Sequence, residues 1–117
     1  MANMTWLEFA QRMQDSPIVL LPSDSFEQHD PHLPLLTDVI LSSTVAEAMA
    51  AHLDGLVAPA VTYSYKSHPK TGGGNHFPGT LSPDAEVFTG LVRNITNELA
   101  RQGVRKVVLI DGYMENP

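Results

Sequence analysis

The sequence contains no cysteine among its 117 residues, which excludes disulfide bonds and thiolate metal ligands. Basic residues are scarce: seven lysines and arginines stand against thirteen aspartates and glutamates, giving a formal net charge of −6. This balance disfavours a nucleic-acid partner, because few cations are available to neutralise phosphates. No apolar run approaches the roughly 20 residues that span a bilayer, and the first residues lack the pattern of a signal peptide. We therefore predict a cytoplasmic globular chain with neither a nucleic-acid nor a membrane partner.

Apolar runs of strand length indicate where a sheet would form. Strands are expected at residues 17–22, 56–61 and 105–111. The first and the last are expected to be buried, the last being the clearest, while Pro59 weakens the second or places it at a sheet edge. Helical patterns lie between and before these runs, at 5–14, at 38–54 and from Ser82-Pro83 to Gly103. This alternation predicts an α/β fold with a parallel sheet, whose functional groups lie at the carboxyl ends of the strands.

The predicted helices carry further signals of how they begin and which faces they bury. Thr5 with Glu8 three residues later has the pattern of a capping box, and Trp6 after Thr5 is expected in the core. Gly55 is a plausible stop for the second helix. Apolar residues at helical spacing predict the faces turned to the core, which are Val39, Ile40, Val45, Ala46, Met49 and Leu53 in the second helix and Val87, Leu91, Ile95 and Leu99 in the third.

The segment after the first predicted strand is rich in groups that bind metals or move protons. SFEQHDPHLPLLTD, residues 25–38, contains Glu27, His29, His32 and Asp38. Glu27 and His29 are two residues apart, so both side chains point the same way in an extended segment. Imidazole and carboxylate groups suit zinc or manganese, and carboxylates can bridge two ions. The alternative is a solvated loop in which Asp38 serves as a helix N-cap, and spacing alone leaves both interpretations open.

A second loop, residues 63–80, contains three consecutive glycines at 72–74. It lacks the spacing of a P-loop and is not followed at once by a helix, so nucleotide binding is disfavoured. Three glycines would instead let the backbone approach a small ligand or a neighbouring subunit closely.

Four stretches in one register carry a family resemblance: EQH, then TD, then YKSHPKTGGGNHFPGT, then a strand ending in DGYMEN. This arrangement resembles the creatininase family of metal-dependent amide hydrolases, and KTGGGNHFPGT at residues 70–80 is its most specific part. The resemblance implies a three-layer α/β/α fold with a mainly parallel sheet, incomplete in this chain. Residues 1–117 would be the N-terminal half of such a domain, with a metal-ligand loop at 23–38 and a Gly-rich loop at 63–80.

The resemblance also implies a set of site residues. Glu27, His29, Asp38 and Glu115 match metal ligands of the family, with Asp38 at the position that bridges two ions. His32 would be a neighbour rather than a ligand. The implied cofactor is a divalent metal, as two ions of zinc or manganese, and Glu115 is also the catalytic candidate. Bound metal would activate water and polarise the amide carbonyl.

The chain departs from the family pattern next to Glu115. Tyr113 stands where the family has a histidine ligand, and tyrosine binds metal only as a phenolate, with an ordinary pKa of about 10. Met114 replaces a tyrosine that contacts substrate, while Thr71 keeps a hydroxyl where creatininase has a serine. Thr71, Met114 and Tyr113 are therefore the candidate substrate-binding residues.

The resemblance ends at about half the length of the family's chains, so the substrate-closing residues of their later half have no counterpart here. We expect a second polypeptide, or the C-terminal half that is missing from a cleaved or truncated chain, to complete the fold, and a higher oligomer to form. Two functions follow. One is a hydrolase subunit that acts on a small cyclic amide such as creatinine. The alternative is a non-catalytic structural or regulatory subunit, which Tyr113 in place of a ligand histidine would favour.

Overall fold

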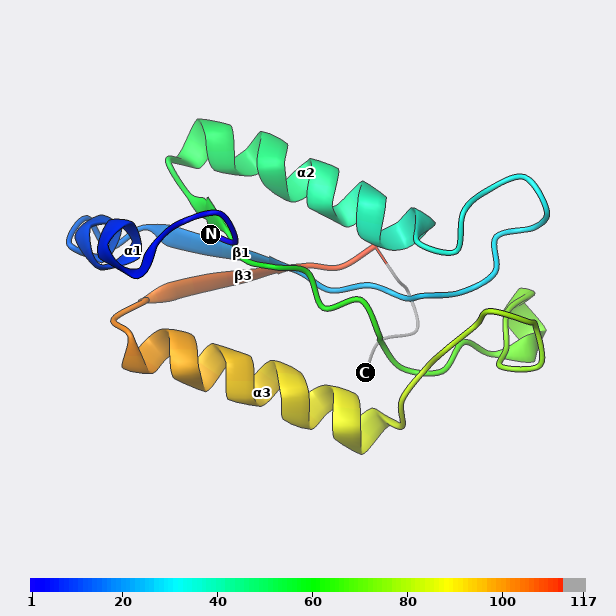
Figure 1. Ribbon diagram of the computed structural model, residues 1–117. Coiled ribbons are helices and arrows are strands. Elements are labelled where there is room, and N and C mark those ends of the chain that lie inside the picture. Colours follow the sequence, from blue (N-terminus) through cyan, green and yellow to red (C-terminus); the bar gives the residue numbers. More distant parts are fainter. Residues whose placement is uncertain (113–117) are drawn as a thin grey trace.

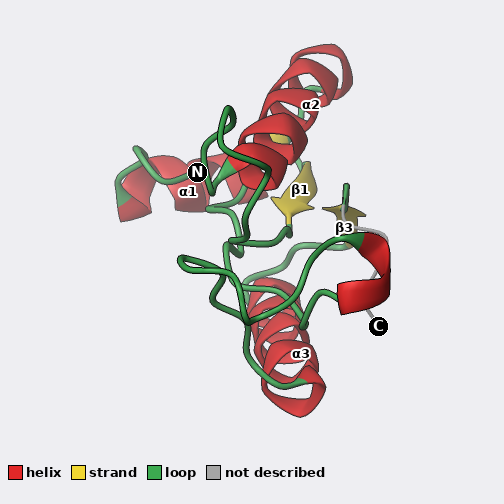
Figure 2. Ribbon diagram, turned by 90° about the vertical axis from the view of Figure 1, so that its right-hand side faces the viewer, coloured by secondary structure: helices red, strands yellow, loops and turns green. Residues whose placement is uncertain are grey.

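The computed structural model describes residues 1–112, apart from the side chain of Thr71. Within this range a parallel sheet has the strand order β2-β1-β3, formed by β1 (Ile18–Pro22), β2 (Leu56–Val57) and β3 (Lys106–Ile110). Helices α2 (Thr37–Leu53) and α3 (Ala85–Arg101) cover opposite faces of the sheet (Figure 1), and the view in Figure 2 shows the three layers. The predicted α/β/α fold with a parallel sheet is confirmed.

The central strand β1 is buried on both faces. Val19, Leu20 and Leu21 are fully buried, as the continuous apolar run predicted. Because successive strand residues face opposite sides, Val19 and Leu21 join Phe88 and Leu99 of α3 in one core cluster, whereas Leu20 turns to the α2 side. Burial of each of these aliphatic side chains stabilises the fold by roughly 1.5–3 kcal/mol.

The two outer strands have different edges. β2 pairs with β1 over two residues only, and its outer edge is covered by the N-terminal amine of Met1, which donates a hydrogen bond of 2.8 Å to the carbonyl of Val57. The edge position predicted from Pro59 is confirmed. β3 was predicted to be buried, which is wrong for the described residues: Val108 is 38% and Leu109 50% exposed. The reason is that β3 has a strand neighbour on one side only within residues 1–112.

Helix α1 (Trp6–Met13) begins as predicted. The Thr5 side chain accepts from the Glu8 N–H, while the Glu8 carboxylate accepts from the Thr5 backbone N–H at 2.7 Å, which completes the capping box. The placement of Trp6 in the core is wrong, since 77% of this residue is exposed. The helix turns Phe9 and Met13 inward instead, and both are half-buried.

The other two helices begin and end near the predicted residues but bury different faces. In α2 the left-handed stop residue is Asp54, one residue before the predicted Gly55. Val39 and Ala46 are buried as predicted, whereas Ile40, Val45 and Leu53 are each almost half exposed. In α3 the N-cap is Asp84 rather than Ser82, and the side chains turned to the core are Phe88, Val92, Ile95 and Leu99.

The strand order places the functional loops. After β1 the chain passes along α2 to one side of the sheet, and after α3 it returns to the other side of β1, so the connections diverge at the carboxyl end of β1. The loop after β1 and the segment containing the 3₁₀ helix η1 (Pro69–Thr71) both extend beyond this end (Figure 1). Among residues 1–112 no helix is both long and apolar enough to cross a bilayer.

Candidate metal centre

The chain leaves β1 inside the protein rather than at its surface. Ser23 donates its N–H to the carbonyl of Ile110, and Asp24 donates its own to that of Val61, so both residues extend the sheet by one step on each side. Ser23, Asp24 and Ser25 are all buried. Thus the first part of the 23–38 loop is not the solvated loop that the sequence left open, although residues 30–34 are exposed.

Three predicted ligands lie together just beyond this buried segment. Glu27, His29 and Asp38 each offer one ligand atom, and these atoms are all within 4.8 Å of one another. Glu27 is buried and the other two are half-buried. Asp38 lies in the first turn of α2, where the N-terminal end of the helix dipole favours a carboxylate. The N-cap position belongs to Leu36, so the alternative role of Asp38 as N-cap is wrong.

The His29–Asp38 pair has the separation expected of two ligands to one ion. His29 Nε2 lies 3.1 Å from Asp38 Oδ2, yet neither atom makes a hydrogen bond of good geometry. Two atoms that are each about 2.1 Å from one ion lie about 3.0 Å apart at a right angle and about 3.4 Å apart at a tetrahedral angle. One nitrogen and two carboxylates also form a donor set that suits zinc or manganese. The described residues therefore fit a divalent ion.

The Gly-rich loop packs against this cluster. A Cβ atom at Gly73 would lie 2.1 Å from Ser67 Oγ and 3.4 Å from Glu27 Oε2, so only glycine lets the backbone pass here. The Ser67 hydroxyl accepts the N–H of Gly74, whose positive φ of 120° suits glycine. The backbone at Gly73 thus approaches the Glu27 carboxylate of the same chain, while its approach to a ligand or a neighbouring subunit stays a prediction.

Gln28, between two of the predicted ligands, joins the two loops. Its Nε2 donates to the Gly72 carbonyl at 2.8 Å, and its Oε1 accepts the Asp30 N–H at 2.9 Å. Its backbone N–H donates to Thr80 Oγ1 at 3.1 Å. These bonds hold the Gly-rich loop beside Glu27 and His29. No sequence motif points to Gln28, since its role depends on a contact between distant loops.

A further carboxylate, Asp24, which no sequence motif singled out, precedes the ligands in the same loop. Asp24 is fully buried, and burial raises its pKa to about 6 from an ordinary 3.8. The nearby Ser42 hydroxyl and the N–H of Gly112, which donates to Asp24 Oδ1, oppose this shift, whereas the nearby charges of Asp111 and Asp38 add to it. Its only signal in the sequence is its position two residues after a fully apolar strand.

The remaining predicted residues are placed as follows. His32 is exposed and is not part of the cluster. Thr71 ends η1, and only its backbone is described. Tyr113, Met114 and Glu115 lie outside the described residues, so their predicted roles stay predictions.

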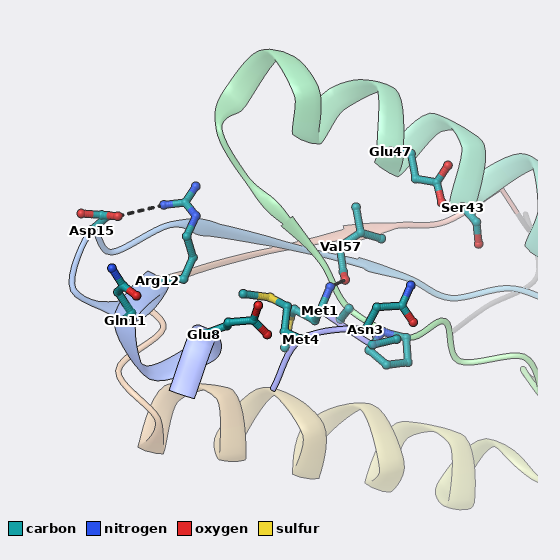
Figure 3. Close-up of a pocket in the computed structure, with 13 residues that line it drawn as sticks. Met1, Asn3, Met4, Glu8, Gln11, Arg12, Asp15, Ser43, Glu47 and Val57 are labelled. Atoms are coloured by element: carbon teal, nitrogen blue, oxygen red, sulfur yellow. Dashed lines mark hydrogen bonds and ion pairs between the residues drawn. The ribbon is translucent and has the colours of Figure 1, made fainter. Parts of the chain in front are cut away.

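A hollow of about 630 Å³ lies elsewhere, between α1, α2 and the outer edge of β2 (Figure 3). Its lining includes Met1, Glu8, Arg12 and Glu47, and it shares no residue with the 23–38 loop. Arg12 is paired with Asp15 there at 3.2 Å. The hollow contributes nothing to the ligand cluster.

A known protein family matches almost the whole of this chain. The profile of the family described as "Creatininase: Creatinine amidohydrolase" matches residues 2–117. The chain belongs to the creatininase family. It is 44% identical over 115 residues to creatinine amidohydrolase of Pseudomonas putida, covering 97% of this chain and 44% of that protein. It is 32% identical to the mycofactocin precursor peptide peptidase of Mycobacterium tuberculosis, covering 92% of this chain and 44% of the peptidase.

Solved structures of this family share the fold. A crystal structure of creatinine amidohydrolase matches with a TM-score of 0.95 and 43% identity, over 99% of this chain and 45% of that one. Two further creatininase structures, described as a Zn-Zn type and as a Mn form, each match with a TM-score of 0.94. The chain therefore spans less than half the length of the relatives that it matches.

Proposed function

We propose that this chain carries the metal-ligand part of a divalent-metal hydrolase acting on a C–N bond of a small cyclic amide such as creatinine. The observation that carries the proposal is the convergence of Glu27, His29 and Asp38 at the carboxyl end of β1. Membership of the creatininase family supports it, as does the similarity to structures of zinc and manganese forms. Glu115 would join as a further ligand and as the catalytic carboxylate, and the cofactor would be two divalent ions.

The chain's own residues have distinct tasks in this proposal. Bound metal would supply Lewis-acid chemistry, lowering the pKa of water and polarising the amide carbonyl. Glu27, His29 and Asp38 would hold the metal, and burial of Glu27 against Gly73 keeps bulk water from that carboxylate. Gln28 holds the Gly-rich loop, which contains the candidate substrate-binding residue Thr71, beside the cluster.

We also propose that a second polypeptide, or the C-terminal half that the family's chains carry, completes the substrate site, within a higher oligomer. The chain spans 44% of the Pseudomonas enzyme, and the exposed Val108 and Leu109 on β3 offer an apolar edge for an added strand. Tyr113 in place of a ligand histidine adds a reason to expect an acid or histidine from the partner.

Metal binding is the first test. We would titrate the metal-free chain with Mn²⁺ and with Zn²⁺ by calorimetry, and compare His29→Ala with His32→Ala. Loss of His29 should weaken binding about 10-fold or more, because an inner ligand matters at least as much as an outer-shell partner. His32→Ala is the matched control, since this exposed histidine lies in the same loop, and it should change affinity less than about 2-fold. Equal effects of the two variants would contradict the assigned ligand set.

Catalysis is the second test. The purified chain would be assayed with creatinine and added Mn²⁺ or Zn²⁺, alone and mixed with the separately produced C-terminal part of the Pseudomonas enzyme. We expect hydrolysis only in the mixture, with a corresponding increase in mass in solution. A stable monomer that hydrolyses creatinine unaided would refute the need for a partner. Metal binding without hydrolysis in any mixture would favour the non-catalytic subunit.

A further inference from the structure

We propose that Asp24 is a positioning residue of the metal centre, whose buried carboxylate ties the two segments that carry Glu27, His29 and Asp38 to the end of β3. The proposal rests on the proposed function, because it assumes that Glu27, His29, Asp38 and Glu115 hold metal. Asp24 itself is not proposed as a ligand.

The three segments meet at this one side chain. Asp24 follows β1 and precedes Glu27 by three residues, and its backbone N–H is fixed to Val61 at 3.0 Å. Its Oδ1 accepts the Gly112 N–H at 3.1 Å, just beyond β3. The Ser42 hydroxyl of α2, one turn after Asp38, lies close enough to favour the ionised carboxylate.

These contacts bear on the predicted ligands. The contact with Ser42 relates the first turns of α2, and so Asp38, to the end of β1. The bond to Gly112 relates the end of β3 to the same point. A single acceptor thus relates three parts of the chain that are far apart in sequence, the last bond spanning 88 residues.

Burial of this carboxylate is costly unless a cation lies nearby. Asp24 is fully buried, its Oδ2 makes no hydrogen bond of good geometry, and the negative charges of Asp38 and Asp111 face it. An uncompensated buried carboxylate is strongly destabilising. A divalent cation between Glu27, His29 and Asp38 would offset this cost. Asp24 therefore fits a protein whose folded state includes metal.

The test compares Asp24→Ala with Asp24→Asn. Both variants remove the negative charge, but only asparagine keeps an acceptor oxygen of the same reach for the Gly112 N–H. The difference between them therefore isolates the hydrogen bond. Affinity for Mn²⁺ would be measured by calorimetry on the full chain, and hydrogen exchange of the Gly112 amide by NMR. Asp30→Asn is the matched control, because it removes an exposed carboxylate from the same loop at a positive φ that asparagine tolerates.

We expect Asp24→Ala to bind Mn²⁺ about 10-fold more weakly than the unaltered chain, and at least about 3-fold more weakly than Asp24→Asn. The Gly112 amide should exchange slowly in the unaltered chain and in Asp24→Asn, and quickly in Asp24→Ala. If Asp24→Ala does not fold, as judged by circular dichroism, Ser42→Ala takes its place, with an expected loss of about 3-fold.

Equal affinities of the alanine and asparagine variants, or a Gly112 amide unaffected by either, would overturn the positioning role. A change in thermal stability with no change in Mn²⁺ affinity would also overturn it, because a residue with a purely structural role would give that result. If the unaltered chain fails to bind either Mn²⁺ or Zn²⁺, the metal centre itself is wrong and this role falls with it. That outcome is distinct from metal binding that is insensitive to Asp24.

Discussion

Replacement of Asp24 by asparagine should make the metal-free protein more stable at neutral pH but not at acid pH. Burial raises the pKa of Asp24 to about 6 from an ordinary 3.8. Because the folded state binds the proton more tightly than the unfolded state, the stabilisation from protonated Asp24 is complete below a pH of about 3.8. It is lost as the pH rises through about 6. Asparagine does not titrate, so the variant escapes this loss.

The size of the effect follows from the shift. One pKa unit corresponds to about 1.36 kcal/mol, so a shift of roughly two units is worth at most about 3 kcal/mol. We expect the free energy of unfolding of Asp24→Asn, relative to the unaltered chain, to rise by about 2 kcal/mol between pH 4.5 and pH 7.5. Saturating Mn²⁺ should reduce this difference, since a nearby cation favours the ionised carboxylate.

Urea unfolding followed by circular dichroism, in the presence of a chelator and at several pH values, measures the difference directly. Asp15→Asn is the control, because the Asp15 side chain is 70% exposed, and its difference should stay within about 0.5 kcal/mol at every pH. A difference between Asp24→Asn and the unaltered chain that does not vary with pH would refute the reasoning, since it would mean that Asp24 titrates as an exposed carboxylate does.

Two further predictions concern the Gly-rich loop and the open edge of the sheet. Gly73→Ala should lower the free energy of unfolding by about 1–3 kcal/mol in thermal unfolding, because the new methyl group collides with Ser67. Gly90→Ala, in α3 with no atom within 4 Å of the added carbon, should instead be neutral or stabilising. Leu109→Lys should shift the chain towards monomer in analytical ultracentrifugation, because a charge on an edge strand opposes strand pairing. Leu91→Lys, also exposed but on α3, should leave the mass unchanged, and equal shifts would argue against association through β3.

The sequence predicted those parts of the fold that depend on one local pattern. β1 could be predicted because a strand buried on both faces needs an unbroken apolar run, and residues 17–22 form such a run. The start of α1 could be read because the capping box is a contact between Thr5 and Glu8, three residues apart. The buried face of α3 could not be fixed, because two apolar series overlap. One begins at Val87 and the other at Phe88, and packing against β1 selects the second.

The buried face of α2 could not be predicted for a different reason. Its sequence is apolar on nearly all sides, so no face stands out, and the structure buries Val39 and Ala46 while Ile40, Leu41 and Val45 remain about half exposed. Only part of the ligand cluster could be predicted from the sequence. The spacing of Glu27 and His29 and the strand end suggested it, but the roles of Gln28, Gly73 and Asp24 depend on contacts between loops that meet only in the folded chain.

The two edges of the sheet indicate on which side a completing partner would bind. On the β2 side, the Met1 amine occupies the Val57 carbonyl, so a strand added there would first have to displace the N-terminal segment. On the β3 side, Val108 and Leu109 are exposed, and no element within residues 1–112 pairs with that edge. A parallel strand added beside β3 would end at the same edge of the sheet as β1 and β3, where Glu27, His29 and Asp38 lie. The side chains after that strand would therefore reach the candidate metal centre from the side of Gly112. Completion of the sheet and completion of the site are then one event, which is why we expect association through β3 and hydrolysis to appear together.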